Sequence, residues 1–139
     1  MIESFTGEYE FLSNFYVCPV TYNGITYKSS EHAYQAAKAL TKEDHDAVMN
    51  CKTPGQAKRM GAKIQIKPDW DKIKNRVMFD IVYNKFDQNK EIREKLFATC
   101  DELLVEGNYW GDCYWGICGG KGLNYLGKIL MEIRGGNTL

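Results

Sequence analysis

The sequence is poor in the features that mark several classes of protein. It has only two histidines, and its five cysteines are scattered without a Cys-x-x-Cys pair, so a zinc site is poorly supported and reduced thiols are expected. No apolar run approaches the roughly 18 residues that a membrane span needs, and the start, MIESFTGEYEF, lacks the segments of a secretion signal. We therefore expect a cytoplasmic protein that has no membrane partner and uses no metal or other cofactor.

Net charge is also missing. Eighteen basic and eighteen acidic side chains give a formal charge of zero, without the broad positive field that non-specific duplex binding requires. A nucleic-acid partner would therefore have to be held locally. The length of 139 residues suits a single core, and we predict one domain over residues 1–139.

The pattern of apolar residues predicts an α+β fold that is mostly helical, with an early β-hairpin and few short strands. Residues 15–28 hold two β-type runs joined by Asn23-Gly24, a strong hairpin signal, and Pro19 places the first run at a sheet edge. Ala33, Ala36, Ala37 and Leu40 then predict a helix that ends near Thr41.

Further helices are expected along the rest of the chain. They cover residues 41–50, 53–61, 68–86, 89–99 and 123–134; in the second of them Thr53 is the N-cap, Pro54 the first residue, Gln56 the partner in a capping box and Gly61 the terminator. A short buried strand is predicted over residues 103–106. The core faces of the last two helices are expected to include Ile92, Leu96, Phe97, Leu123, Leu126, Leu130 and Ile133.

The loop before the last helix is rich in glycine. Gly116, Gly119, Gly120 and Gly122 surround Lys121 immediately ahead of the helix N-terminus, where exposed N–H groups would suit a phosphate. The spacing is not that of a P-loop or of a dinucleotide-binding fingerprint. A turn that simply needs glycine explains the pattern equally well.

The same loop is rich in aromatic residues. Tyr109, Trp110, Tyr114 and Trp115 flank Asp112, in polar surroundings that suit stacking on a base. The alternative is that one of the tryptophans fills the core beneath the loop.

Glu31 lies in the first turn of a predicted helix. A carboxylate there complements the helix dipole by about 0.3–1 kcal/mol, which by itself explains the residue. The same position favours the charged form, so a catalytic Glu31 would act as a base, a nucleophile or a cation stabiliser, with Asp112 or Glu106 as a second carboxylate. His32 points about 100° away around the helix and is expected to pack or cap rather than to form a dyad with Glu31.

Several separate motifs resemble those of one family. They are SNFY at 13–16, NGITYKSSEHAYQAAK at 23–38, AKRMG at 57–61, Trp70, NKF at 84–86, YWGD at 109–112 and GKGLNYLGKILMEIR at 120–134. Together they are similar, in order and spacing, to the NADAR family, also called the YbiA-like or riboflavin-intermediate N-glycosidase family. The resemblance spans nearly the whole chain.

This resemblance implies an N-glycoside hydrolase that acts on ribose phosphate or ADP-ribose linked to a nitrogen base. It implies that Glu31 is the catalytic carboxylate and that Asp112 supports the water or the leaving group. Substrate-binding positions implied in the same way are Asn14, Phe15 and Lys38 around the pocket, Trp70 and Trp110 facing the sugar or base, and Gly120, Lys121, Gly122, Asn124 and Gly127 at a phosphate. The segment CYWGIC, bulkier than expected for bacterial relatives, bears on the choice of substrate.

We therefore predict a metal-independent N-glycosidase. Its expected substrate is ADP-ribose on guanine, including in single-stranded DNA, in an antitoxin or counter-defence role. Hydrolysis of phosphorylated riboflavin intermediates is the alternative reaction. A non-catalytic ADP-ribose or nucleotide sensor, with Glu31 only as a cap, is the alternative from another class.

Overall fold

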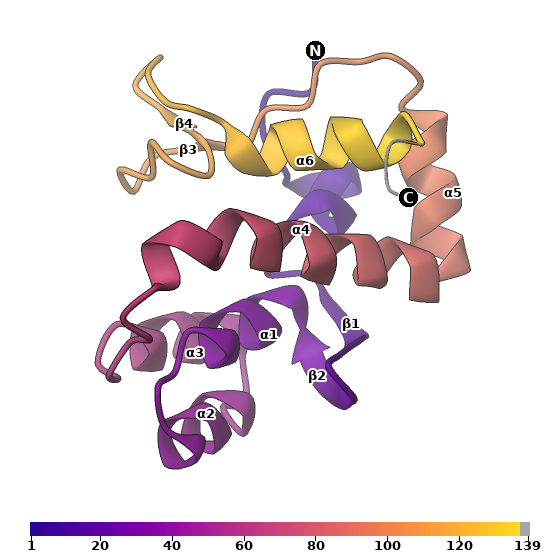
Figure 1. Cartoon of the computed structure of the whole chain (residues 1–139). Coiled ribbons are helices and arrows are strands. Elements are labelled where there is room, and N and C mark those ends of the chain that lie inside the picture. The colour runs from indigo at the N-terminus through magenta and orange to yellow at the C-terminus, as the bar shows by residue number, and fades with distance from the viewer. Residues whose placement is uncertain (137–139) are drawn as a thin grey trace. The chain divides into compact units, whose positions relative to one another are not determined.

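The structure, a computed structural model, describes residues 1–136 and contains two compact units. One is Asn14–Gln88, and the other combines Met1–Ser13 with the chain from Asn89 onward. The first unit holds β1 (Val17–Tyr22), β2 (Ile25–Ser29), α1 (Ser30–Ala37), α2 (Lys42–Met49), α3 (Pro54–Gly61) and α4 (Trp70–Gln88) (Figure 1). The second holds η1 (Gly7–Leu12), α5 (Lys90–Ala98), β3 (Gly107–Asn108), β4 (Ile117–Cys118) and α6 (Tyr125–Arg134).

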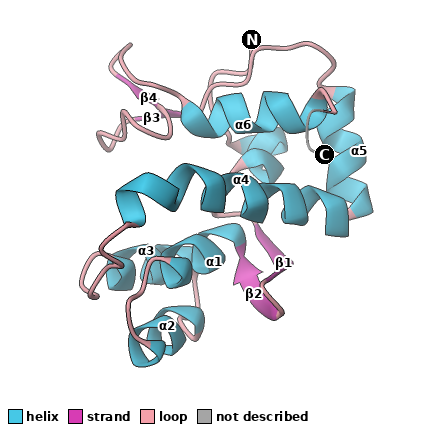
Figure 2. Cartoon of the chain, viewed as in Figure 1, coloured by secondary structure: helices cyan, strands magenta, loops and turns pink. Residues whose placement is uncertain are grey.

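Helices dominate both units, and the strands are short (Figure 2). The predicted α+β class is therefore confirmed. No helix within residues 1–136 combines the length and the apolar character that crossing a membrane requires.

The early hairpin is confirmed as an antiparallel pair of β1 and β2. Asn23 and Gly24 form its two-residue turn with φ values of 51° and 79°, the left-handed backbone that this type of turn needs. The register shifts by one residue between Val17 and Val20, and Pro19 lies in that bulge. Pro19 therefore does not interrupt a regular ladder, which it could not have joined as a donor.

The predicted N-terminal cap of α3 is also confirmed, whereas the C-cap is Ala62 and Gly61 is still helical. Thr53 accepts a hydrogen bond from the backbone N–H of Gln56, whose side chain completes the capping box, and Pro54 opens α3. α1 ends at Ala37, however, not near Thr41. The chain leaves the helix there because Ala39 and Leu40 pair with residues 65–66, with Leu40 donating to the carbonyl of Gln65 at 2.9 Å.

Three other local predictions are wrong. Residues 103–106 form no strand: Leu104 makes only an isolated bridge to Ile2. Phe97 and Leu123, expected in the core, are each about half exposed. Leu123 lies outside α6, because the helix starts only after Asn124, which adopts a left-handed φ of 53°.

The core of the first unit forms where α4 packs against β1 and α1. α4 buries Met78, Ile81, Val82 and Phe86, and between the last two it buries Lys85 completely. The Lys85 ammonium lies 5.7 Å from the ring centre of Tyr16 and 5.2 Å from that of Phe86. Burial lowers the pKa of Lys85 to about 8, against a smaller opposing effect of Cys18.

We expect Lys85→Met to raise the free energy of unfolding by about 1–3 kcal/mol at pH 7, because it removes a buried charge at similar volume. Since the folded-state pKa of about 8 lies below the usual 10.5, the wild type gains stability as pH rises between these values. The advantage of the variant should therefore shrink from pH 8 to 10. Urea unfolding of both proteins at several pH values measures this, and a difference that does not vary with pH would contradict it.

Candidate active site

Glu31 lies in the first turn of α1 with only 7% of its surface exposed, so it is a buried carboxylate and not an ordinary surface cap. Its backbone N–H donates to the carbonyl of Asn14 at 3.0 Å, which fixes the start of the helix. Its Oε2 accepts a 2.7 Å hydrogen bond from Nε2 of Gln35. A buried charge needs such support, since its desolvation is costly.

Gln35 and Lys38 follow Glu31 by four and seven residues, so the three side chains share one face of α1. Burial lowers the pKa of Lys38, and the charge of Glu31 partly offsets this by raising it. The two ionisable groups are therefore coupled. The place expected for Lys38, around the substrate pocket, stays a prediction.

Asn14 is held from two sides. Its Oδ1 accepts from the hydroxyl of Ser30 at 2.9 Å, and its Nδ2 donates to Sδ of Met78 at 3.4 Å. These bonds connect the segment before β1 to α1 and α4. They give Asn14 a structural role, and its part in substrate binding stays a prediction.

The two aromatic residues expected near the substrate in this unit differ in exposure. Trp70, the first residue of α4, is buried and packs on Tyr34 with ring centres 5.3 Å apart. Phe15 is 43% exposed, and the ammonium of Lys58 lies 5.8 Å from its ring centre. Phe15 thus lies beside a cation and Trp70 is packed on Tyr34, and the substrate-binding role of each stays a prediction.

His32 is a packed residue, as predicted. Its Nε2 donates to the carbonyl of Cys51 at 2.9 Å, which leaves Nδ1 to accept from the hydroxyl of Ser29 at 2.6 Å. Burial lowers the pKa of His32, and the hydrogen bond to the carbonyl of Cys51 offsets part of this shift by raising the pKa. Both ring nitrogens of the neutral imidazole are thus hydrogen-bonded to other residues and do not form a dyad with Glu31.

The loop of the second unit places Asp112 at a tight turn. One carboxylate oxygen, Oδ1, accepts from the backbone N–H groups of Tyr114 and Trp115 at 3.0 and 2.9 Å. The side chain of Asn108 bonds both the N–H and the C=O of Asp112. Asp112 therefore has a structural role in this turn, and its catalytic role stays a prediction.

The glycine-rich segment forms a tight turn, and its place at a phosphate stays a prediction. Cys118 and Lys121 exchange backbone hydrogen bonds, with Gly119 and Gly120 at φ values of 61° and 77° between them. The expectation that the N–H groups at the start of α6 are exposed is wrong. Those of Tyr125 and Leu126 donate to the carbonyls of Tyr114 and Trp115 at 3.2 and 3.0 Å.

Two further residues assigned to phosphate are engaged with the backbone of the same unit. The Asn124 amide accepts from the N–H of Glu106 at 3.0 Å and donates to the carbonyl of Leu104 at 2.9 Å. Gly127 is buried, and a Cβ there would overlap that carbonyl of Leu104. The glycine is therefore explained by close packing, while Lys121 and Gly122 lie exposed beside the turn.

The aromatic residues of this loop divide into two sets. Tyr114, Trp115 and Tyr125 contact one another, with ring centres 4.8 to 6.5 Å apart. Tyr109 is 91% and Trp110 52% exposed, and their rings meet edge to face at 5.2 Å. Trp110 is thus half exposed, and its place facing the sugar or base stays a prediction. Across residues 1–136, no three His, Cys, Asp or Glu side chains are grouped so that they could hold a metal ion.

Comparison with known proteins assigns the family. The model of the NADAR domain matches residues 3–136. The chain belongs to the NADAR family. It is 37% identical over 134 residues to the "N-glycosidase YbiA" of Escherichia coli, covering 94% of this chain and 83% of that protein. Its fold matches the NMR structure of E. coli YbiA with a TM-score of 0.86 at 34% identity, over 99% of this chain and 86% of that one.

Two more relatives of this NADAR protein carry informative names. The "N-glycosidase Npun_R5314" of Nostoc punctiforme is 41% identical over 110 residues, which cover 75% of this chain and 70% of that protein. The "Riboflavin biosynthesis protein VVA0006" of Vibrio vulnificus is 40% identical over 127 residues, which cover 89% of this chain and 34% of that longer protein.

Gln35 is the residue that the sequence analysis did not select. Its position one turn after Glu31 was the available signal, since side chains four apart on a helix are neighbours. That signal alone does not distinguish an exposed pair from a buried one. The structure shows a buried amide bonded to a buried carboxylate.

We expect Asp112→Asn to leave the free energy of unfolding within about 0.5 kcal/mol of wild type, because an amide oxygen can still accept from both N–H groups. Asp112→Ala should lose about 1–3 kcal/mol, since both N–H groups lose their acceptor. Chemical denaturation of the three proteins checks this. Equal losses in both variants would show that these two hydrogen bonds do not hold the turn.

Proposed function

We propose that the protein is an N-glycosidase that hydrolyses the C–N bond between a phosphorylated ribose and a nitrogen base, and that Glu31 is its catalytic carboxylate. The observation that carries this proposal is the buried carboxylate of Glu31, bonded to Gln35 and coupled to Lys38, in a member of the NADAR family. The relatives named as N-glycosidases support the reaction type.

The reaction suits a buried anion. Breaking a ribosyl C–N bond develops positive charge on C1 and the ring oxygen, so a fixed carboxylate stabilises the transition state more than the ground state. Burial strengthens this effect because little water screens the charge. The same carboxylate can accept a proton from the attacking water. Glu31 therefore needs to be ionised and held in one orientation.

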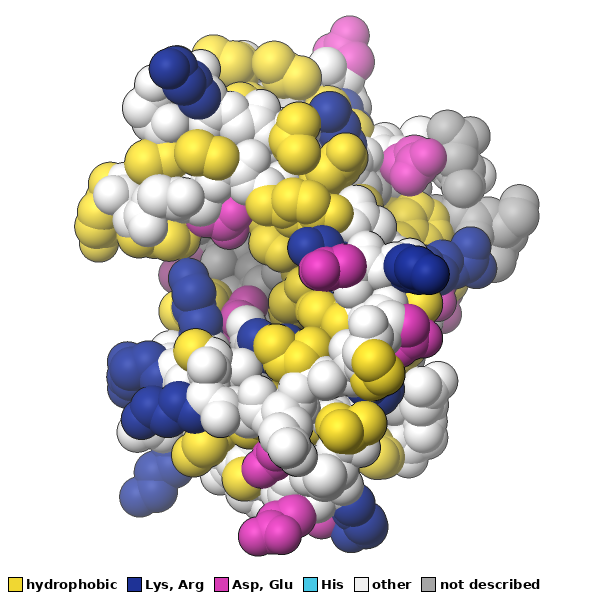
Figure 3. Space-filling view, turned by 60° about the vertical axis from the view of Figure 1, so that its left-hand side comes forward, with side chains coloured by type: hydrophobic (Ala, Val, Ile, Leu, Met, Phe, Trp, Pro, Cys, Tyr) yellow, Lys and Arg dark blue, Asp and Glu magenta, His cyan; other side chains and the backbone are white. Residues whose placement is uncertain are grey.

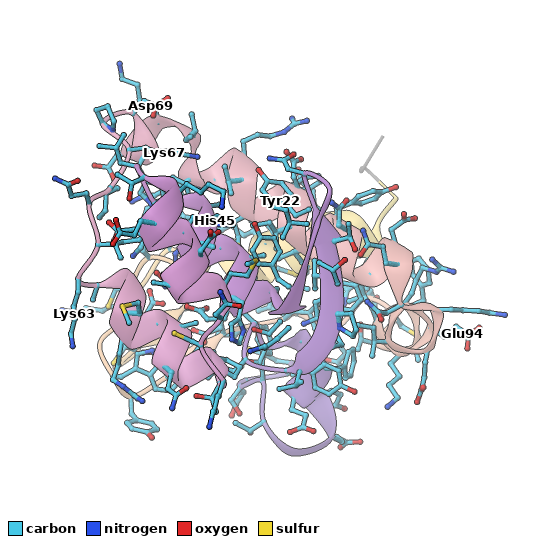
Figure 4. All side chains as sticks on the ribbon, turned by 90° about the horizontal axis from the view of Figure 1, so that it is seen from below. Tyr22, His45, Lys63, Lys67, Asp69 and Glu94 are labelled. Atoms are coloured by element: carbon cyan, nitrogen blue, oxygen red, sulfur yellow. The ribbon has the colours of Figure 1, made fainter. Side chains whose placement is uncertain are left out.

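A phosphorylated substrate agrees with the charge around α3. The segment of residues 52–67 has no Asp or Glu and five basic residues, Lys52, Lys58, Arg59, Lys63 and Lys67. Figure 4 shows Lys63 extending outward from the chain that follows α3, and several Lys and Arg side chains lie together at the lower left of the face in Figure 3. Such a segment supplies local positive charge to a protein whose net charge is zero.

For the substrate we propose ADP-ribose linked to guanine, including in single-stranded DNA, processed in the cytoplasm as an antitoxin or counter-defence reaction. A local basic segment suits a pyrophosphate or a strand held at one place. Phe15 in one unit and Trp110 in the other, 43% and 52% exposed, are separate candidates for stacking on a base. Asp112 is a candidate for the second carboxylate, and its Asn variant separates its charge from its role in the turn.

A second candidate reaction is the hydrolysis of phosphorylated riboflavin intermediates. It is favoured by the names of two relatives, the Vibrio vulnificus protein VVA0006 and the "Riboflavin biosynthesis protein PYRR, chloroplastic" of Zea mays. The chemistry assigned to Glu31 is the same for both substrates.

The test uses wild type and Glu31→Gln with guanine-ADP-ribosylated single-stranded DNA and, in parallel, with a phosphoribosylated amino-pyrimidine. Mass spectrometry follows the released sugar and base. We expect Glu31→Gln to lower kcat by about 10²–10⁴-fold while ADP-ribose binding is retained, because only the charge under the developing cation is lost.

Glu43→Gln is the matched control. Glu43 also lies in the first turn of a helix, α2, but is exposed, so its variant changes only a helix-dipole interaction. Release by wild type and the control, but not by Glu31→Gln, supports the proposal. Binding of ADP-ribose with no turnover of either substrate by any of the proteins would establish a sensor instead.

A further inference from the structure

Gly61, the last residue of α3, lies against the side chain of Gln35. A Cβ built on Gly61 would overlap Oε1 of Gln35 and would lie 2.8 Å from its Cδ and 3.1 Å from its Cβ. Contacts below 3.0 Å force something to move. Gly61 is buried in a helical conformation, so its backbone does not require glycine. What requires glycine here is the space occupied by Gln35.

This glycine has a local disadvantage. Glycine in a helix is less favourable than alanine, so Gly61→Ala would stabilise an isolated helix. The close approach to Gln35 offsets that preference. It allows α3 to cover the Gln35 amide directly.

The orientation of the Gln35 amide is set by its two ends. Nε2 donates to the carboxylate of Glu31 at 2.7 Å, and turning the amide over would place its oxygen against that carboxylate. Oε1 therefore points to α3, where it is buried without a hydrogen-bond partner. The side of Gly61 where a Cβ would stand faces this oxygen.

We infer that Gln35 is a positioning residue for Glu31 and that Gly61 holds Gln35 in place, an inference that rests on the catalytic role proposed for Glu31. The donated hydrogen bond fixes one carboxylate oxygen and favours the charged form. α3 keeps the amide from rotating away. The three residues act as a series, Gly61 on Gln35 and Gln35 on Glu31.

The first test is Gly61→Ala. The added methyl group displaces the Gln35 amide, and we expect kcat to fall by about 10–100-fold with KM little changed. Because Glu31 loses a bond to its charged form, the acidic limb of the pH profile of kcat should move to higher pH. Gln35→Met, which removes the amide at similar volume, should produce the same shift.

Gly55→Ala is the matched control in the same helix. A Cβ on Gly55 meets only Nη1 of Arg59 at 3.7 Å and Oγ1 of Thr53 at 4.0 Å, which are ordinary contacts. Its activity and pH profile should equal those of wild type. Thermal unfolding confirms that each variant is folded before its kinetics are compared.

A double-mutant cycle isolates the pair. In a Gln35→Ala background the methyl group of Gly61→Ala has no amide to displace, so it should cause no further loss of kcat. Losses that multiply, or an unchanged pH profile in Gln35→Met, would overturn the inference. If Glu31→Gln itself remains fully active, the proposed function fails. If Glu31→Gln is inactive while Gly61→Ala and Gln35→Met keep normal kinetics, only the positioning inference fails.

Discussion

The proposed active site depends on the hydrogen bond that Gln35 donates to the buried carboxylate of Glu31. A glutamate on a helix surface needs no partner, but one with 7% of its surface exposed must be stabilised by charge, dipole and donors. The start of α1 supplies the dipole, Gln35 the donor and Lys38 the opposite charge. The groups that stabilise the buried carboxylate favour its charged form, which is the form that can stabilise a cation in the proposed reaction.

The rest of the first unit fixes where α1 begins. The β1–β2 hairpin delivers Ser29, whose side chain accepts from the N–H of His32 and so caps the helix. Asn14 receives the N–H of Glu31 and the hydroxyl of Ser30, and it reaches α4 through Met78. The first turn is thus bonded at two places, to Ser29 and to Asn14. A carboxylate carried by such a turn has little freedom to move, which is what transition-state stabilisation requires.

The features that were predicted best from the sequence are those that depend on residues close together along the chain. The Asn23-Gly24 turn and the capping box of Thr53 follow from short-range chemistry, and both are present. Prediction failed where distant segments compete: α1 ends early because residues 39–40 pair with residues 65–66, and the N–H groups of Tyr125 and Leu126 are taken by the preceding loop. The burial of Glu31 also could not be predicted, because it depends on segments that meet only in space, as Gln35 of α1 and Gly61 of α3 do. The contact of Gly61 with Gln35 could not be predicted for the same reason. From the sequence alone, a glycine at the end of a helix indicates only a terminator.

We propose that Glu31 accepts the proton of the water that attacks C1 of the ribose. Single-turnover cleavage in water enriched in ¹⁸O, with mass analysis of the sugar released by wild type and by Glu31→Gln, measures this step. We expect one ¹⁸O atom in the C1 hydroxyl of the sugar from wild type and no labelled sugar from the variant on the same timescale. Label found elsewhere in the product, or equal labelling by both proteins, would exclude this role of Glu31.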